Sequence, residues 1–117
     1  MRVRTPDGNY VALGYRGLWY AGDFRGAFLG KMFGGQWGEV NSGRFDGFVR
    51  KPDAIWLRLE KKGFSFIGSF SLDGSLFETL GEQTMLRFDG SRLDLVAHDE
   101  SQGVETAAKF DYVEVIQ

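Results

Sequence analysis

The sequence of 117 residues contains no cysteine, a single histidine and two prolines. Without cysteine the chain can form no disulfide, no thiolate metal site and no thiol nucleophile. The single imidazole, His98, cannot build a multi-histidine metal site and has no second imidazole to work with. We therefore expect neither a metal nor a cofactor.

Long apolar runs and an excess of positive charge are also lacking. No stretch approaches the roughly 18 apolar residues of a membrane-spanning helix. The formal net charge is −2, which disfavours non-specific attraction to nucleic acid or to an anionic membrane. We therefore expect neither nucleic acid nor a membrane as a partner. The composition fits any compartment, so the localisation stays open.

Glycine and aromatic residues are abundant instead, with 17 glycines and 15% aromatics. This composition suits short strands joined by tight turns, and helix-favouring runs are scarce. A chain of this length can bury a core of its own as one domain. We predict a single all-β domain over residues 1–117, an antiparallel β-sandwich.

The clearest pattern lies in residues 54–81, which predict three consecutive antiparallel strands. Lys62-Gly63 and Asp73-Gly74 place glycine where tight hairpin turns need a positive φ. A two-residue turn at Lys62-Gly63 would set Leu59 opposite Phe66 and would give the strands one apolar face. The apolar face would contain Ile55, Leu57, Leu59, Phe64, Phe66 and Phe70.

The rest of the chain gives weaker strand patterns. Residues 10–16 alternate like a strand, and residues 85–88 and 92–97 predict a hairpin. Residues 106–116 predict a closing strand. The glycine-rich residues 17–49 fit either short hairpins or a long loop, and the sequence does not choose between them.

Several segments resemble a known family. WLRLE (56–60), FSLDG (70–74) and AKFD (108–111) are similar to strand and hairpin motifs of the C-terminal half of concanavalin A-like jelly-roll domains. The branch that they resemble accompanies β-xylosidases and related glycoside hydrolases. Such domains are nearly twice as long, so the resemblance implies that residues 17–49 or a second chain complete the sandwich. We expect a homodimer, because a half-sandwich would leave an apolar face and strand edges exposed.

The predicted polar face is the candidate binding surface. It carries Trp56, Arg58 and Glu60, with Ile67 on the neighbouring strand. An aromatic ring can stack on the C–H face of a sugar while charged groups bond its hydroxyls. Trp19 and Trp37, set among glycines, could add aromatic contacts from loops.

These residues predict a non-catalytic, lectin-like carbohydrate-binding module. The alternative is a structural or assembly module that uses the same aromatic face as a homo-oligomer interface. A third interpretation is a small β-barrel around an apolar ligand, with Phe64, Phe66 and Phe70 lining its cavity.

Two other functions fit the sequence less well. KGFSFIGSF (62–70) approaches the RNA-binding motif of RNA-recognition domains, but the expected register buries its phenylalanines. Glu60 and Glu78 could share one face as a glycosidase pair, about 10 Å apart across two strand steps. That separation is marginal, so we expect no enzymatic activity and no catalytic residues.

Overall fold

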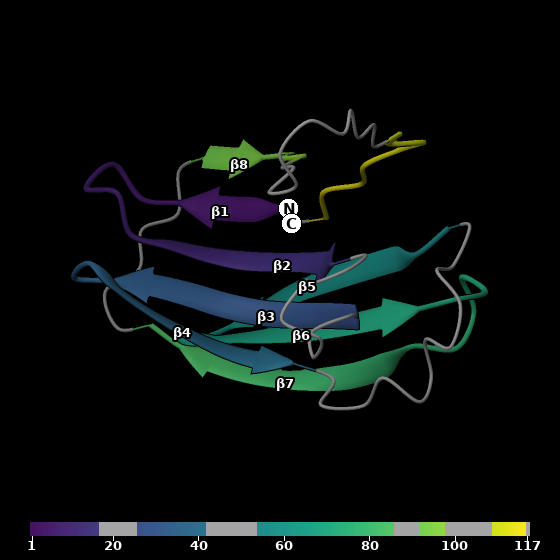
Figure 1. Ribbon diagram of the computed structural model, residues 1–117, viewed down its shortest axis with the longest axis horizontal. Coiled ribbons are helices and arrows are strands. Elements are labelled where there is room, and N and C mark those ends of the chain that lie inside the picture. The colour runs from purple at the N-terminus through teal and green to yellow at the C-terminus, as the bar shows by residue number, and fades with distance from the viewer. Residues whose placement is uncertain (17–25, 42–53, 86–91, 98–108, 117) are drawn as a thin grey trace.

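The computed structural model describes residues 1–16, 26–41, 54–85, 92–97 and 109–116. In this part of the chain eight strands form two antiparallel sheets (Figure 1). The five-stranded sheet has the order β4-β3-β2-β1-β8, with β1 (Arg2–Arg4), β2 (Tyr10–Arg16), β3 (Gly26–Phe33), β4 (Gln36–Asn41) and β8 (Arg92–Asp94). The three-stranded sheet has the order β5-β6-β7, with β5 (Trp56–Lys62), β6 (Ser65–Ser71) and β7 (Glu78–Thr84).

The two sheets stack face to face, with β6 and β7 against β3 and with β7 also against β4 (Figure 1). Alternation sends every second side chain of each strand into the space between them. The buried side chains there are Val11, Leu13, Leu29, Phe66 and Met85, with Ala27 and Phe70 beside them. The prediction of an all-β sandwich is confirmed. Within the described residues no helix could span a membrane.

Two polar side chains form hydrogen bonds between the sheets where β3 packs against β7. Lys31 Nζ donates to the carbonyl oxygen of Thr84 at 2.7 Å, and Gln83 Nε2 donates to that of Leu29 at 3.3 Å. Both side chains lie on the inward face by register, and Gln83 Nε2 also lies 3.4 Å from the carbonyl oxygen of Gly38. The two sheets are thus tied together by hydrogen bonds as well as by apolar packing.

The first hairpin of the three-stranded sheet turns one residue later than predicted. Lys62 pairs with Ser65, so the turn residues are Gly63 and Phe64, with Gly63 at a φ of 60°. The register therefore differs by two residues from the expected one, and Leu59 lies opposite Gly68. Because side chains alternate with a period of two, this shift leaves every strand residue on its predicted face.

Phe64 corrects the predicted core. As a turn residue it is 60% exposed, whereas Phe66 and Phe70 are buried. The two sheets are also open rather than closed into a barrel among the described residues. The predicted β-barrel, with an apolar cavity lined by Phe64, Phe66 and Phe70, is therefore wrong.

The second turn is a loop of residues 72–77 rather than a tight turn. Asp73 organises this loop, because its Oδ1 accepts the backbone N–H groups of Ser75 at 2.8 Å and Leu76 at 3.0 Å. Gly74, at a φ of 78°, donates its N–H to Ser71 Oγ. The glycine is needed here for the positive φ, as the sequence indicated.

The glycine-rich region supplies strands. β3 and β4 form a hairpin whose turn is Gly34-Gly35, both at positive φ. Residues 17–25 and 42–53 lie outside the described residues, and so does the predicted site residue Trp19.

The end of the chain departs from prediction. β8 pairs with β1 in an antiparallel ladder. Residues 86–88 of the hairpin expected with residues 92–97 lie outside the described residues, so that pairing stays a prediction. Residues 109–116 belong to no strand of the described part, although their alternation predicts one. Alternation identifies a strand-like segment but does not identify the strand edge that it joins.

Candidate functional site

The outward face of the three-stranded sheet forms an open groove of about 550 Å³. The register sets two rows of side chains across the strands, one from Arg58 through Ser69 to Thr79 and one from Glu60 through Ile67 to Glu82. These six residues line the groove. Arg58 and Glu60, predicted from the sequence as site residues, therefore lie together in it.

The groove is polar around an apolar centre. Ile67 lies in the middle strand between the two glutamates. Glu60 forms an ion pair with Lys62 at 3.5 Å, and Glu82 accepts a hydrogen bond from the Ser65 hydroxyl. Acidic, basic and hydroxyl groups thus surround a small hydrophobic patch, which is the mixture that a hydroxylated ligand requires.

Phe77 holds Arg58 in place at one end of the groove. The guanidinium carbon lies 3.7 Å from the centroid of the ring, a cation–π contact. A guanidinium stacked on a ring keeps its N–H groups at its rim, where they can meet carboxylates or hydroxyls. Phe77 therefore positions the main hydrogen-bond donor of the groove.

Trp56 lies on the same face but is not among the residues that line the groove. Its indole packs under the loop of residues 72–77, so closely that a Cβ at Gly74 would lie 2.9 Å from the ring. The side chain is half-buried. In this position Trp56 supports the loop beside the groove and offers less ring surface than a free stacking platform.

The Asp73 carboxylate stabilises the same loop. The backbone N–H of Leu76, then that of Ser75 and the Ser71 hydroxyl, hold the pKa of Asp73 below its ordinary value. Hydrogen bonds to the charged form have this effect because protonation would break them. The loop that covers Trp56 is thus built on an ionised aspartate.

Trp37 lies on the opposite side of the molecule. It belongs to β4 and points outward from the five-stranded sheet, where its ring lies over Gly30. The ring is 41% exposed, and its Nε1 donates to Glu39 at 3.1 Å. Trp37 and Arg58 therefore belong to two different surfaces, although the sequence grouped them as one set.

Sequence reasoning missed three groove residues: Phe77, Thr79 and Glu82. The prediction placed Glu78 opposite Ser69, but Glu78 pairs with Phe70 and does not face Glu60. An irregularity between Gly68 and Ser69 shifts the register, and Glu82 takes the position facing Glu60. Residues 77–84 show no regular alternation, because the irregularity puts outward residues such as Thr79 and Glu82 an odd number of positions apart.

Glu60 and Glu82 are separated by two strand steps, about 10 Å between their backbones. Carboxylate pairs of retaining glycosidases lie about 5 Å apart and those of inverting enzymes below about 10 Å. Within the described residues, no group of three potential metal ligands is found.

No protein-family model, curated protein or solved structure matches this chain. The resemblance to concanavalin A-like jelly-roll domains therefore remains a prediction from the motifs alone.

Proposed function

We propose that the chain is a non-catalytic carbohydrate-binding module and that its site is the groove on the three-stranded sheet. The observation that supports this proposal is the pair of side-chain rows that crosses the strands. Arg58, Glu60 and Glu82 offer charged hydrogen-bonding groups, and Thr79 offers a hydroxyl. All of them project from paired strands, so little backbone entropy is lost when a ligand binds.

The shape of the groove favours a sugar over a compact apolar ligand. Its lining alternates polar and apolar surface, and it is open along the sheet rather than enclosed. A saccharide presents hydroxyls around its rim and C–H groups on its faces, which would meet the glutamates and Ile67 respectively. Charge-assisted hydrogen bonds are about twice as strong as neutral ones, so Arg58 and the glutamates would dominate the affinity.

A glycan array tests this proposal with the unaltered chain and the variants Arg58→Ala and Glu82→Gln. We expect binding to a limited set of glycans, weakened about tenfold or more by either substitution because each removes a charge-assisted bond. Lys109→Ala is the matched control for Arg58→Ala, since it removes one positive charge from a side chain that is 91% exposed. The Lys109 variant should bind like the unaltered chain.

Binding that both groove variants leave unchanged would contradict the groove as the site. Absence of binding to any glycan would contradict the proposal as a whole. Release of shorter sugars from a bound glycan, abolished by Glu82→Gln, would show an enzyme instead of a binding module.

A second candidate function, assembly through a homo-oligomer, is favoured by a different surface. Leu93, Leu95 and Val96, in and after β8, are about 40% exposed. Residues 109–116 add exposed apolar side chains at Phe110, Tyr112, Val113, Val115 and Ile116. Exposed strand-like segments of this kind are association surfaces, and a homodimer would cover them.

Light scattering at several protein concentrations tests the homodimer. We expect the mass of two chains, falling to one in the variant Val113→Lys, because a buried lysine without a partner disfavours association. Lys62→Ala, on β5 and with a side chain that is 70% exposed, should leave the mass unchanged. A single-chain mass at all concentrations would contradict the homodimer without affecting the groove.

A further inference from the structure

The outward face of the five-stranded sheet combines an aromatic platform with an arginine edge, and the proposed groove uses neither. The platform consists of Trp37 with Tyr10, Phe28 and Gly30. The arginine edge consists of Arg4 on β1 and Arg92 on β8, joined by Asp94. One line of paired residues crosses the whole sheet, from Arg92 and Arg4 through Tyr10 and Met32 to Trp37.

The Trp37 ring is held in place by its neighbours. A Cβ at Gly30 would lie 2.2 Å from the ring, so the indole occupies the space that any other residue would fill. Tyr10 and Phe28 flank it, with ring centroids at 6.0 Å and 6.4 Å. The Arg2 guanidinium covers Tyr10 at 4.3 Å, which leaves Trp37 as the exposed ring of the platform. An indole that is fixed by its neighbours and 41% exposed offers a ring on which a sugar face can stack.

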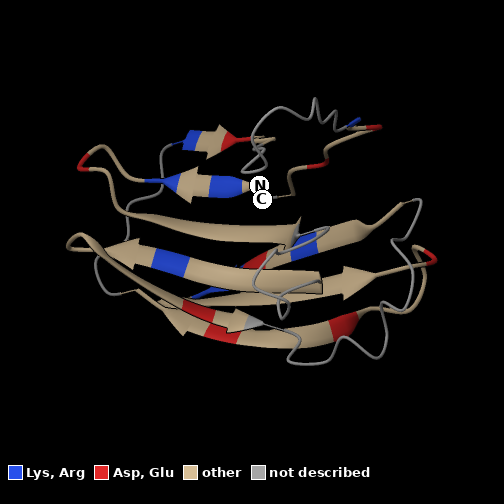
Figure 2. Cartoon of the chain, in the orientation of Figure 1, with Lys and Arg blue, Asp and Glu red and all other residues tan. Residues whose placement is uncertain are grey.

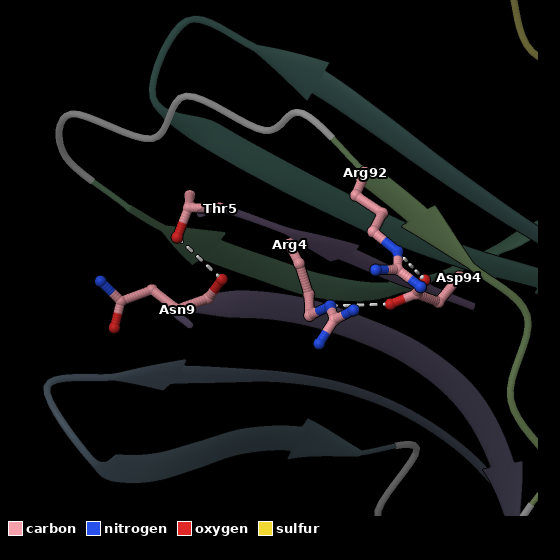
Figure 3. A network of polar contacts seen from close by, with 5 residues as sticks. All are labelled: Arg4, Thr5, Asn9, Arg92 and Asp94. Carbon is pink, nitrogen blue, oxygen red and sulfur yellow. Dashed lines mark hydrogen bonds and ion pairs between the residues drawn. The ribbon is translucent and has the colours of Figure 1, made fainter. Parts of the chain in front are cut away.

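The arginine edge carries an excess of positive charge. Arg4 Nε lies 2.8 Å from one Asp94 oxygen, and Arg92 Nε lies 2.7 Å from the other (Figure 3). One carboxylate thus faces two guanidiniums. Each arginine contacts Asp94 through Nε, and among the described residues its two terminal amino groups have no other hydrogen-bond partner. Figure 2 shows the basic residues of β1 and β8 side by side at this end of the sheet.

We propose that this face is a second binding site and that its ligand is an acidic glycan, a chain of uronic acid residues. One sugar ring stacks on Trp37, and a carboxylate further along the chain binds Arg4 and Arg92 bidentately. Trp37 and Arg4 are three strand steps apart, about 14 Å, so the ligand is an oligosaccharide rather than a single sugar. This inference shares its class of ligand with the proposed function but none of its residues.

Charge and stacking favour an acidic glycan over single-stranded nucleic acid. A nucleic-acid strand needs several exposed rings for successive bases and a basic groove for its phosphates. Among the described residues of this face one ring, that of Trp37, is exposed, and Glu39 lies beside it as the acceptor for Trp37 Nε1. The chain as a whole carries a net charge of −2.

Calorimetry with oligomers of galacturonic, glucuronic and mannuronic acid tests this inference, with the methyl ester of each oligomer as the neutral control. We expect at least one acid oligomer to bind about tenfold more tightly than its ester, since charged hydrogen bonds are lost on esterification. Trp37→Ala and Arg92→Gln should each weaken that binding about tenfold or more. Arg92 is the safer substitution for folding, because its side chain is 68% exposed.

Arg58→Ala separates the two proposals. Acid oligomer binding that survives Arg58→Ala but fails in Trp37→Ala and Arg92→Gln supports the second site, whatever the groove binds. Binding that fails only in Arg58→Ala overturns this inference and leaves the proposed function standing. The inference of a second site is also overturned if no acid oligomer binds. It is overturned as well if oligodeoxythymidylate binds more tightly than the acid oligomers through the same residues.

Discussion

The two outward faces of this sandwich follow the same rule of alternation but present different surfaces. In the three-stranded sheet, small residues such as Ser69 on the central strand lie between longer charged side chains, which leaves a groove. In the five-stranded sheet, Gly30 lies under the indole of Trp37, and the ring fills the space above the glycine. The comparison shows that the size of neighbouring residues decides whether a sheet face is hollow or filled.

The shared core should be the most sensitive point, because it supports both faces. Leu13→Ala removes a fully buried side chain between the sheets. We expect a loss of about 2–5 kcal/mol in the free energy of unfolding, measured by urea denaturation. The amide signals of Trp37 and those of the groove residues should report the same midpoint. Separate midpoints would mean that the two sheets unfold independently.

Substitution of two glycines tests the difference between the inner and outer faces of the sheets. Gly68 lies between the sheets, and Gly30 lies on the outer face. A Cβ at Gly68 would lie 3.1 Å from Leu13 and 3.2 Å from Leu29, so Gly68→Ala should destabilise the fold by about 1–3 kcal/mol. Gly30→Ala displaces only the exposed Trp37 ring and should change stability by less than about 1 kcal/mol. Thermal denaturation and near-ultraviolet circular dichroism measure the two effects. Equal destabilisation by both substitutions would contradict this assignment of faces.

The ion pairs of the two faces should differ in strength. The Asp94 side chain is 17% exposed and faces two arginines, so Asp94→Asn should cost about 1 kcal/mol of stability. The pair of Lys62 and Glu60 is far more exposed, at 70% and 42%. Lys62→Gln should therefore change the free energy of unfolding by less than about 0.5 kcal/mol. The ranking would be wrong if Lys62→Gln proved the more harmful in denaturation experiments.

The smallest effect should be local and dependent on pH. The folded state lowers the pKa of Asp73 through the backbone N–H groups of Leu76 and Ser75 and the Ser71 hydroxyl. The stabilisation is complete above the unfolded pKa of about 3.9 and is lost as the pH falls through the lower folded value. The amide proton shifts of Ser75 and Leu76 should titrate with a midpoint below 3.9, and Asp73→Asn should abolish that titration. A midpoint at or above 3.9 would contradict the hydrogen bonding of the loop.

Much of the candidate site could be predicted from alternation. The period of two placed Arg58 and Glu60 together on an outward face, and it did so even though the turn was predicted one residue too early. A register change of two residues moves neighbours along the strand but never to the other face. Glu82 could not be found in this way, because the irregularity beside Gly68 changes the pairing of β7. Phe77 could not be found either, because it lies in the loop of residues 72–77, where alternation does not apply.

By itself, the sequence determined some local features of this protein: the strands β2, β5 and β6, the glycine turns, the inward phenylalanines Phe66 and Phe70, and the outward charges of β5. These depend on backbone sterics and on contacts between near neighbours in the chain. The tertiary structure alone decided that β8 joins β1 and that Trp37 and Arg58 face away from each other. It also placed the Trp56 indole under the loop of Asp73. Such arrangements depend on which apolar faces pack together, and many strand orders satisfy the same alternation.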